Sequence, residues 1–121
     1  MTSRTRQPGD AFTHAADVAI EDLGGGIRRQ ILGFGATIMS CRLWFDSGAV
    51  GTVHQHPHAQ TTYIESGRFT ARVGSTVREV GAGDCVYITP DTDHGISCID
   101  AGSLIDNFSP MRADFLNPGE A

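Results

Sequence analysis

Apolar and polar residues alternate along several short stretches of the chain, which is the pattern of a β-strand. The clearest case lies between residues 36 and 46. One set of alternate positions holds Met39, Cys41, Leu43 and Phe45, and the other holds Ser40, Arg42, Trp44 and Asp46. Successive side chains of a strand point to opposite faces, so the first set is expected to lie inside one sheet layer. The pattern does not explain why Trp44 lies on the more polar face, where it could line a pocket or an interface.

Further strands are predicted over residues 27–32, 68–73, 76–80, 84–88 and 96–105. Residues 10–23 fit either a short helix capped by Asp10 or a strand, and we favour the strand. Turns are predicted at residues 24–26 and 33–35, and Gly74-Ser75 is expected to form a two-residue hairpin turn. No segment shows a strong helical period. Short strands with glycine turns at this density predict an all-β sandwich or barrel with almost no helix.

The composition is that of an ordinary soluble domain. A length of 121 residues, with 40% hydrophobic and 19% charged residues, suits one domain with a real core. The net charge of −5 and the lack of a basic run argue against a nucleic-acid partner. No stretch is long enough for a transmembrane helix, and the first 14 residues lack the apolar run of a signal peptide. Three widely spaced cysteines suit buried apolar positions, and together these features predict a reducing cytoplasm.

The chain concentrates its candidate chemistry near position 56. His54, His56 and His58 lie within five residues, and Gln60 follows two places later. Residues i and i+2 of a strand share a face, so the first two histidines are expected to point at one metal ion. Pro57 removes a backbone donor and fixes φ, so a bend there would turn Gln60 toward the same point. The alternative is a solvated polar loop that happens to be rich in histidine.

The spacing from Gly48 to Gly67, with the histidines and Gln60 between them, resembles the first sequence motif of the cupin superfamily. Gln60 stands where that family usually has Glu. Residues 81–95, GAGDCVYITPDTDHG, resemble the second motif, although residue 81 is not Pro and no Asn follows His94. The resemblance implies a single-domain cupin (a double-stranded β-helix, or jelly-roll barrel) over residues 16–116. It leaves a flexible arm at 1–15 and a tail at 117–121, and it implies His94 as the last metal ligand.

The resemblance thus implies one divalent transition metal ion as cofactor, held by His54, His56, Gln60 and His94. Nickel, zinc, iron and manganese all remain open, because the ligand types do not choose among them. Without a carboxylate ligand the cation keeps its full charge, which favours Lewis-acid chemistry and an anionic substrate. This set differs from the two-histidine, one-carboxylate set of many iron oxygenases. His58 is either a loop histidine or a second-shell contact of the metal.

Residues 104–116, LIDNFSPMRADFL, resemble the end of KdgF-type pectin-degradation cupins. The resemblance also takes in residues 24–33 and 54–60, and in all it covers roughly residues 18–116. It implies an enzyme, of isomerase type, that converts 4,5-unsaturated uronates from pectin or alginate to the linear 5-keto-4-deoxyuronate. The partner is then a small acidic sugar, with no nucleic acid and no membrane, and the family suggests a homodimer.

The positions that match the catalytic residues of this family are Asp106, Phe108 and Arg112. Asp106 would move protons during ring opening and ketonisation. Phe108, on the same strand face, would pack on the sugar, and Arg112 would bind the uronate carboxylate with two N–H groups. The structural alternative for this stretch is a final strand ending in a proline turn, with Arg112 on the surface. Two other functions remain open: a small metal-dependent dioxygenase or other cupin isomerase, and a non-catalytic cupin that binds a small molecule.

Overall fold

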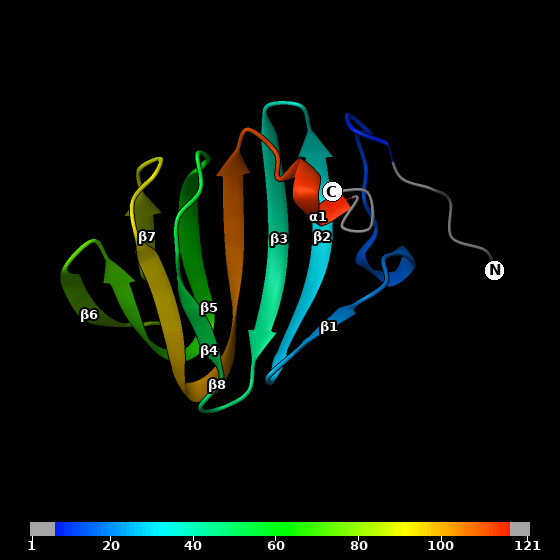
Figure 1. Cartoon of the computed structure of the whole chain (residues 1–121). Coiled ribbons are helices and arrows are strands. Elements are labelled where there is room, and N and C mark those ends of the chain that lie inside the picture. The colour runs from blue at the N-terminus through cyan, green and yellow to red at the C-terminus, as the bar shows by residue number, and fades with distance from the viewer. Residues whose placement is uncertain (1–6, 117–121) are drawn as a thin grey trace.

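The computed structural model describes residues 7–116, and in this range most of the chain forms strands (Figure 1). The only helical pieces in this range are a 3₁₀ turn, Ala15–Asp17, and one helical turn, α1 (Ala113–Leu116). The strands are β1 (Glu21–Gly24), β2 (Ile27–Gly35), β3 (Ile38–Phe45), β4 (Val50–His54), β5 (Ala59–Val73), β6 (Thr76–Gly81), β7 (Cys85–Ile88) and β8 (His94–Ser109). All pairings are antiparallel. The predicted all-β class is therefore confirmed.

Two long strands, β5 and β8, pair along their whole length and bend together. Gly67 and Gly102 lie at the bend, where the two backbones touch: a Cβ added to Gly67 would lie 2.5 Å from the carbonyl oxygen of Asp100. Gly67 also has a φ of +83°, a conformation that side chains rarely allow. The glycines therefore permit two strands to serve both layers of the fold.

The bend divides the strands between two layers. On one side of it, the second half of β8 pairs with β3 and with the first half of β5, and β1, β2 and β7 extend this layer. On the other side, the first half of β8 pairs with β4 and with the second half of β5, which also pairs with β6. A shared pair of strands thus closes two layers around an interior.

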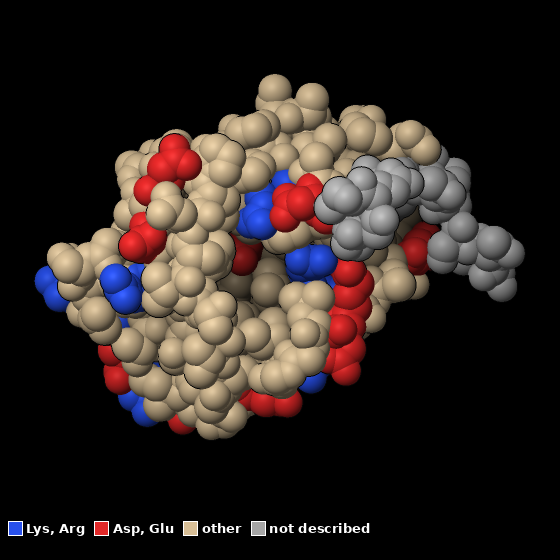
Figure 2. Space-filling model, in the orientation of Figure 1, with Lys and Arg blue, Asp and Glu red and all other residues tan. Residues whose placement is uncertain are grey.

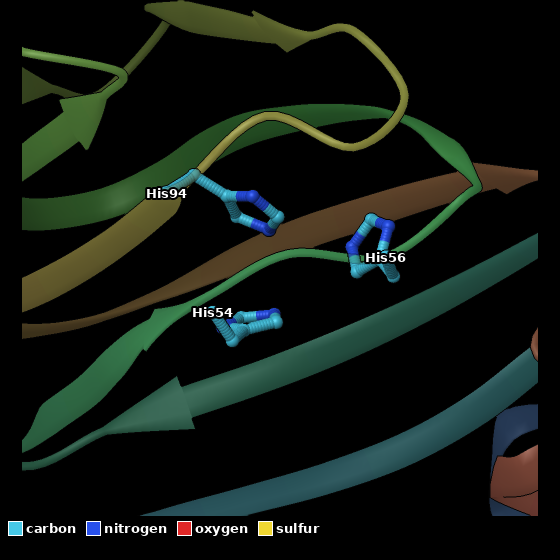
Figure 3. A group of neighbouring side chains, drawn as sticks. All are labelled: His54, His56 and His94. Carbon is cyan, nitrogen blue, oxygen red and sulfur yellow. The ribbon is translucent and has the colours of Figure 1, made fainter.

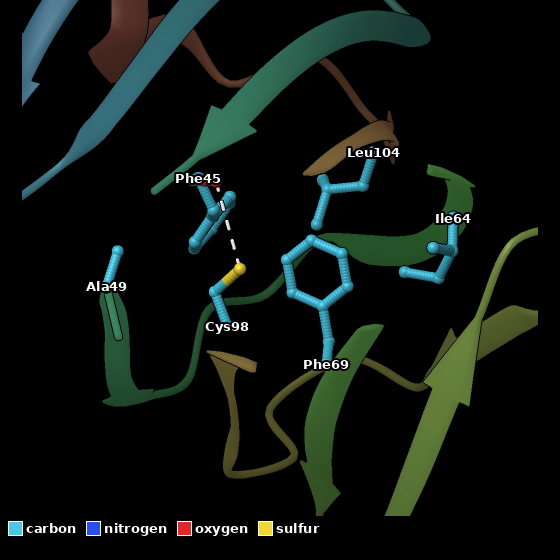
Figure 4. Close-up of a cluster of buried hydrophobic side chains, with 6 residues drawn as sticks. All are labelled: Phe45, Ala49, Ile64, Phe69, Cys98 and Leu104. Atoms are coloured by element: carbon cyan, nitrogen blue, oxygen red, sulfur yellow. Dashed lines mark hydrogen bonds between the residues drawn. The ribbon is translucent and has the colours of Figure 1, made fainter. Parts of the chain in front are cut away.

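The first core cluster fills one part of this interior (Figure 4). It consists of Phe45, Ala49, Ile64, Phe69, Cys98 and Leu104. Phe69 is fully buried, and its ring meets that of Phe45 edge to face, with centroids 5.4 Å apart. The Cys98 thiol lies 3.8 Å from the carbonyl oxygen of Phe45, in the role of a small buried apolar residue. The prediction of buried cysteines holds for Cys41 and Cys98 but is wrong for Cys85, which is exposed.

The second core cluster lies where the C-terminal segment folds over β2, β3 and β8. It consists of Ile31, Phe34, Met39, Cys41 and Phe108, and Met111, Phe115 and Leu116 pack against it. The inward set predicted for β3 is confirmed, since Met39, Cys41 and Phe45 are buried and Leu43 packs against both clusters. Trp44 does not line the interior cavity: it lies on the other face, with the guanidinium of Arg42 5.0 Å from its ring.

The prediction of a strand over residues 10–23 is wrong for most of that range. Only its end belongs to β1, and the 3₁₀ turn comes before it. The buried side chain of Gln30 explains this turn, because its amide donates to the carbonyl oxygens of Ala15 and Val18. The predicted turn at residues 33–35 is also wrong, since β2 runs through it with a bulge. The Gly74-Ser75 hairpin turn is confirmed, with a φ of +60° at Gly74.

The expected N-terminal arm lies partly outside the described residues, and the expected tail at 117–121 lies wholly outside them. In the described part of the arm, the backbone N–H of Gly9 donates to the carbonyl oxygen of Phe34 at 2.8 Å. The arm therefore contacts β2 at this point. The three boundaries of the domain prediction stay predictions.

Candidate metal centre and active site

Three histidines from separate places in the fold point toward one another (Figure 3). His54 ends β4 and pairs in register with His94, which begins β8, while His56 lies in the loop after β4. One ring nitrogen from each can be chosen so that all three lie within 4.8 Å of one another. The prediction that a strand continues through His56 is wrong, because β4 ends at His54. The loop nevertheless brings the rings together.

Hydrogen bonds fix how these three rings carry their protons. Each Nδ1 atom contacts a backbone carbonyl oxygen. His54 contacts that of Thr52 at 2.8 Å, His94 that of Thr92 at 2.8 Å, and His56 that of His58 at 3.0 Å. A carbonyl can only accept, so each Nδ1 carries a hydrogen and each neutral ring keeps its lone pair on Nε2. Metal-binding histidines are held in this way, with the second nitrogen bonded to a carbonyl. The side chains therefore fit a divalent transition metal ion.

Two of the three rings, those of His56 and His94, are buried, and this burial supports the same conclusion. His94 is 4% exposed, and its Nε2 atom is buried without a hydrogen-bond partner among the described residues. Burial lowers the pKa of His94, and the neighbouring His54 and His56 lower it further, against the hydrogen bond to Thr92. A ligand to a metal must be neutral, so this environment keeps the ring in the form that binds. A buried polar atom of this kind needs a partner, and a metal ion would supply one.

Gln60 connects the histidines with a carboxylate. Its side-chain oxygen lies 2.9 Å from Nε2 of His56, and its NH₂ group donates to Thr62 at 3.0 Å and to Asp106 at 3.1 Å. Nε2 of His56 and the amide oxygen of Gln60 are both acceptors, so they repel each other unless a hydrogen or a cation lies between them. A cation bound by both removes this conflict. The geometry therefore agrees with Gln60 as a ligand, which stays a prediction.

Asp106 is held in place by this network on β8. Its Oδ1 atom accepts from the hydroxyl of Thr62 at 2.6 Å and from the amide of Gln60. Burial raises the pKa of Asp106 to about 6, although both hydrogen bonds and the charge of Arg112 lower it. A carboxyl group with a pKa near neutrality can both accept and return a proton. Asp106 therefore suits the role predicted for it.

A cavity of about 330 Å³ lies beside the histidines and opens on the face shown in Figure 2, where charged side chains surround a hollow. Its polar wall includes Arg29, His54, Gln60, Thr62, His94, Asp106 and Arg112. Its apolar wall includes Ile27, Leu43, Phe45, Ile88, Ile96 and Leu104. The predicted site residues other than His56 and His58 thus share one cavity. His56 is 8% exposed and contacts the network through Gln60.

Phe108 and Arg112 form one end of the cavity. Phe108 is only 3% exposed and packs on the rings of His56 and Phe115, so little of it is available to a ligand. The Arg112 guanidinium donates to both carboxylate oxygens of Asp114, at 3.0 and 2.9 Å, and its carbon lies 5.2 Å from the Phe108 ring. The side chain of Arg112 is 13% exposed, so the alternative that left it on the surface is wrong.

His58 supports the cluster from outside the cavity. Its carbonyl oxygen accepts from His56, and its ring lies 5.3 Å from that of His56 and 6.5 Å from that of Phe108. Burial and the charge of Arg112 lower the pKa of His58. This carbonyl contact with His56 agrees with a role for His58 in holding the histidine cluster, which stays a prediction.

Two residues of the polar wall, Thr62 and Arg29, were not predicted from the sequence. Thr62 carried no visible signal. Arg29 had one, because Ile27, Arg29 and Ile31 alternate with Arg28 and Gln30, which places a basic residue on the apolar face of a predicted strand. A charge at such a position is rarely without a function or a partner.

Comparison with known proteins identifies the family. Residues 43–105 match the model of the cupin domain. The chain is a cupin. This cupin is 39% identical over 98 residues to the pectin degradation protein KdgF of Dickeya dadantii, an alignment that covers 79% of the chain and 89% of that protein. It is thus a KdgF-like cupin, as the sequence predicted.

Solved structures agree. An RmlC-like cupin from Shewanella frigidimarina is 43% identical, with a TM-score of 0.87, over 91% of this chain and 99% of that one. KdgF from Halomonas sp. is 34% identical, with a TM-score of 0.82, over 87% and 97% of the two chains. In the described part of the cupin, no helix is long and apolar enough to cross a membrane.

Proposed function

We propose that this cupin is a metal-dependent enzyme that opens and ketonises 4,5-unsaturated uronates from pectin or alginate, giving 5-keto-4-deoxyuronate. The observation that carries the proposal is the position of Asp106. Its carboxyl group, with a pKa of about 6, is joined by the Gln60 amide to the histidine cluster in a cavity that also holds Arg112. The similarity to KdgF, a pectin degradation protein, points to the same substrates.

The reaction is an isomerisation and needs no oxidant. The anomeric hydroxyl of the cyclic sugar loses its proton, and a C1–O carbonyl forms while the bond from C1 to the ring oxygen breaks. The electron pair of that bond leaves an enolate at C5. C4 then gains a proton and C5 becomes a ketone. One proton therefore leaves an oxygen and one arrives at a carbon, which a single well-placed carboxyl group can achieve.

Asp106 is suited to both transfers. Thr62 and Gln60 bind its Oδ1 atom, while its Oδ2 atom has no hydrogen bond within residues 7–116 and is available for proton exchange. A divalent ion held by His54, His56, His94 and Gln60 would supply Lewis-acid stabilisation of the negative charge on oxygen. The metal ligands cannot themselves carry the proton, because their lone pairs are engaged.

Arg112 would bind the uronate carboxylate, and Phe108 would support that binding. The Nε and Nη2 atoms of Arg112 donate to the Asp114 carboxylate, so Nη1 is the donor that would remain for the carboxylate of the substrate. The Phe108 ring lies 5.2 Å from the guanidinium carbon of Arg112 and is almost fully buried. It would therefore support Arg112 rather than contact the sugar. Three further parts of the proposal stay predictions. The metal is nickel, zinc, iron or manganese, the protein is a homodimer, and its location is cytoplasmic.

The test is turnover of unsaturated galacturonate by the purified protein loaded in turn with each of these metals. The loss of ultraviolet absorbance from the conjugated double bond reports the reaction. We expect Asp106→Asn to retain the metal and lose turnover by about a hundredfold or more. Asp46→Asn, at an exposed carboxylate that does not line the cavity, is the matched control and should behave as wild type.

Three outcomes would contradict the proposal in different ways. Wild-type turnover by Asp106→Asn together with loss in His58→Gln would assign the proton transfer to His58. Uptake of dioxygen, measured on the same sample, would favour the dioxygenase function. Binding of the sugar without consumption under any metal would favour a binding protein.

A further inference from the structure

Two arginines lie beside the same aromatic ring in the cavity. The guanidinium carbon of Arg29 is 3.9 Å from the centroid of Phe115, and that of Arg112 is 4.2 Å from it. Both side chains line the cavity and are only 12% and 13% exposed. Two like charges this close, and partly shielded from water, destabilise each other unless negative groups compensate them.

Each arginine has one carboxylate of its own, and each uses the same edge to bind it. Arg29 donates from Nε and Nη2 to Glu21, at 3.3 and 3.2 Å, and Arg112 donates from Nε and Nη2 to Asp114. In the described part of the chain, Nη1 of both arginines has no hydrogen-bond partner. The two ion pairs therefore fix the guanidinium planes. They leave the Nη1 donors of two cavity-lining arginines without a described partner.

The neighbouring arginine on the same strand shows that this arrangement is specific to one face. Arg28 points to the other face of β2, where its side chain is 43% exposed and its Nη1 lies 3.5 Å from a carboxylate oxygen of Asp46. It does not line the cavity. Position 27, on the cavity face, is Ile, so the face that carries Arg29 is otherwise apolar.

We propose that Arg29 and Arg112 together bind the carboxylate of the substrate, one Nη1 group to each oxygen, and that Arg29 makes the cavity selective for acids over neutral sugars. Glu21, Asp114 and Phe115 hold the two guanidinium groups in position. The inference deepens the proposed function and rests on it for the choice of a uronate. Hydrogen bonds between charged groups are the strong ones, so loss of one guanidinium should be measurable in binding alone.

Binding and turnover are measured separately on the metal-loaded protein. Calorimetry with galacturonate and with galactose gives affinity for the acid and for a neutral sugar of the same size. For Arg29→Met we expect Kd for galacturonate and KM for unsaturated galacturonate to rise about tenfold or more, with kcat changed much less. Binding of galactose should not change. Arg28→Met is the matched control and should bind galacturonate as wild type does.

A second variant separates ligand binding from a purely structural role. If Arg29 only anchors the C-terminal segment through Phe115 and its ion pair, Glu21→Gln should weaken galacturonate binding and lower the melting temperature as much as Arg29→Met does. The proposal instead predicts a smaller loss of binding in Glu21→Gln, about threefold, because the guanidinium and its charge remain and only its orientation is less fixed. Arg29→Lys should recover part of the affinity, since it restores the charge without the planar donors.

The results also distinguish this inference from the proposed function. Unchanged galacturonate binding in Arg29→Met, or no binding by the wild type, overturns the inference whether or not the enzyme turns over its substrate. Binding that depends on Arg29 in a protein that never consumes unsaturated uronate supports the inference and overturns the proposed function.

Discussion

The two core clusters take residues from the same strands, β3 and β8, but differ in what these residues contact. The first core cluster takes Phe45 from β3 and Leu104 from β8, and its members contact one another and other apolar side chains. The second takes Cys41 from β3 and Phe108 from β8, in register with Asp106 and Met39 respectively. Burial raises the pKa of the Cys41 thiol to about 12, and the charge of Asp106 adds to this effect. The second cluster therefore adjoins ionisable groups that the first does not meet.

This difference teaches how a small barrel divides its work. One half of the β3–β8 pair supplies apolar side chains, of which Phe45 and Leu104 also form part of the apolar wall of the cavity. The other half packs its apolar residues behind Asp106, His56 and Arg112, so its shape sets where these groups lie. Changes in the first cluster at residues that do not line the cavity should therefore alter stability, and changes around the second should alter chemistry.

The largest expected effect is on stability, at Phe69. Phe69→Ala removes a fully buried ring from the first core cluster and should lower the free energy of unfolding by about 3–5 kcal/mol, measured by chemical denaturation. The kcat per folded molecule should stay near that of the wild type. Phe12→Ala, at a side chain that is 83% exposed, should change neither quantity. A large loss of kcat in folded Phe69→Ala would contradict the division between the clusters.

Next comes the metal. His56→Ala removes a buried ring of the histidine cluster and should lower metal affinity by about a hundredfold or more, seen as loss of metal from the purified protein. His14→Ala, outside the cluster, is the control. Wild-type loading in His56→Ala would exclude it as a ligand. Because ligands must be neutral, the wild type should also release metal as the pH falls below about 6.5.

A smaller effect should appear in the pH dependence of stability of the metal-free protein. The pKa of Asp106 is raised to about 6 in the folded state, above the ~3.9 of an unfolded chain, so ionisation of this group disfavours folding. Below pH 4 both states are protonated and no penalty exists. Between about pH 4 and 6 the wild type should lose stability relative to Asp106→Asn, by about 1–2 kcal/mol after allowing for partial exposure to solvent. Denaturation curves that stay parallel across this range would contradict the raised pKa.

The smallest effect is expected at Arg112. Arg112→Lys keeps the charge but loses the planar pair of donors, so KM should rise about fivefold while kcat changes less. Steady-state kinetics on unsaturated galacturonate measures both. Arg68→Lys, at an exposed ion pair, serves as the control. A fall in kcat without a rise in KM would instead place Arg112 in the chemical step.

Local signals were enough to predict the fold class and two members of the histidine cluster. Alternation on β3 needs only neighbouring residues, and His54 and His56 lie two positions apart, whereas His94 was implied only by the family resemblance. The bend of β5 was missed for a physical reason. Bulges between Ile64 and Phe69 break the two-residue period where the strand passes from one layer to the other, so only the part after the bend, residues 68–73, was predicted as a strand.

Contacts between distant residues account for the other differences. The turn at Ala15 is fixed by Gln30, and no local pattern near Ala15 reports that side chain. The hydrogen bonds that hold Asp106 come from β5, 44 and 46 residues away, so the sequence suggested its role only through a family resemblance. Arg29 was visible as a misplaced charge, yet its partner Glu21 and the ring of Phe115 emerge only in the folded chain.

The amide of Gln60 has a consequence for observing this site. Its oxygen lies next to His56 of the histidine cluster and its NH₂ group next to Asp106, so this one side chain would join a cation bound by the cluster to the acid. A carboxylate at this position would have no hydrogen to donate to Asp106 at pH 7. The two amide protons of Gln60 are therefore a built-in spectroscopic reporter: in nuclear magnetic resonance, their chemical shifts would register metal loading from one side and the protonation of Asp106 from the other.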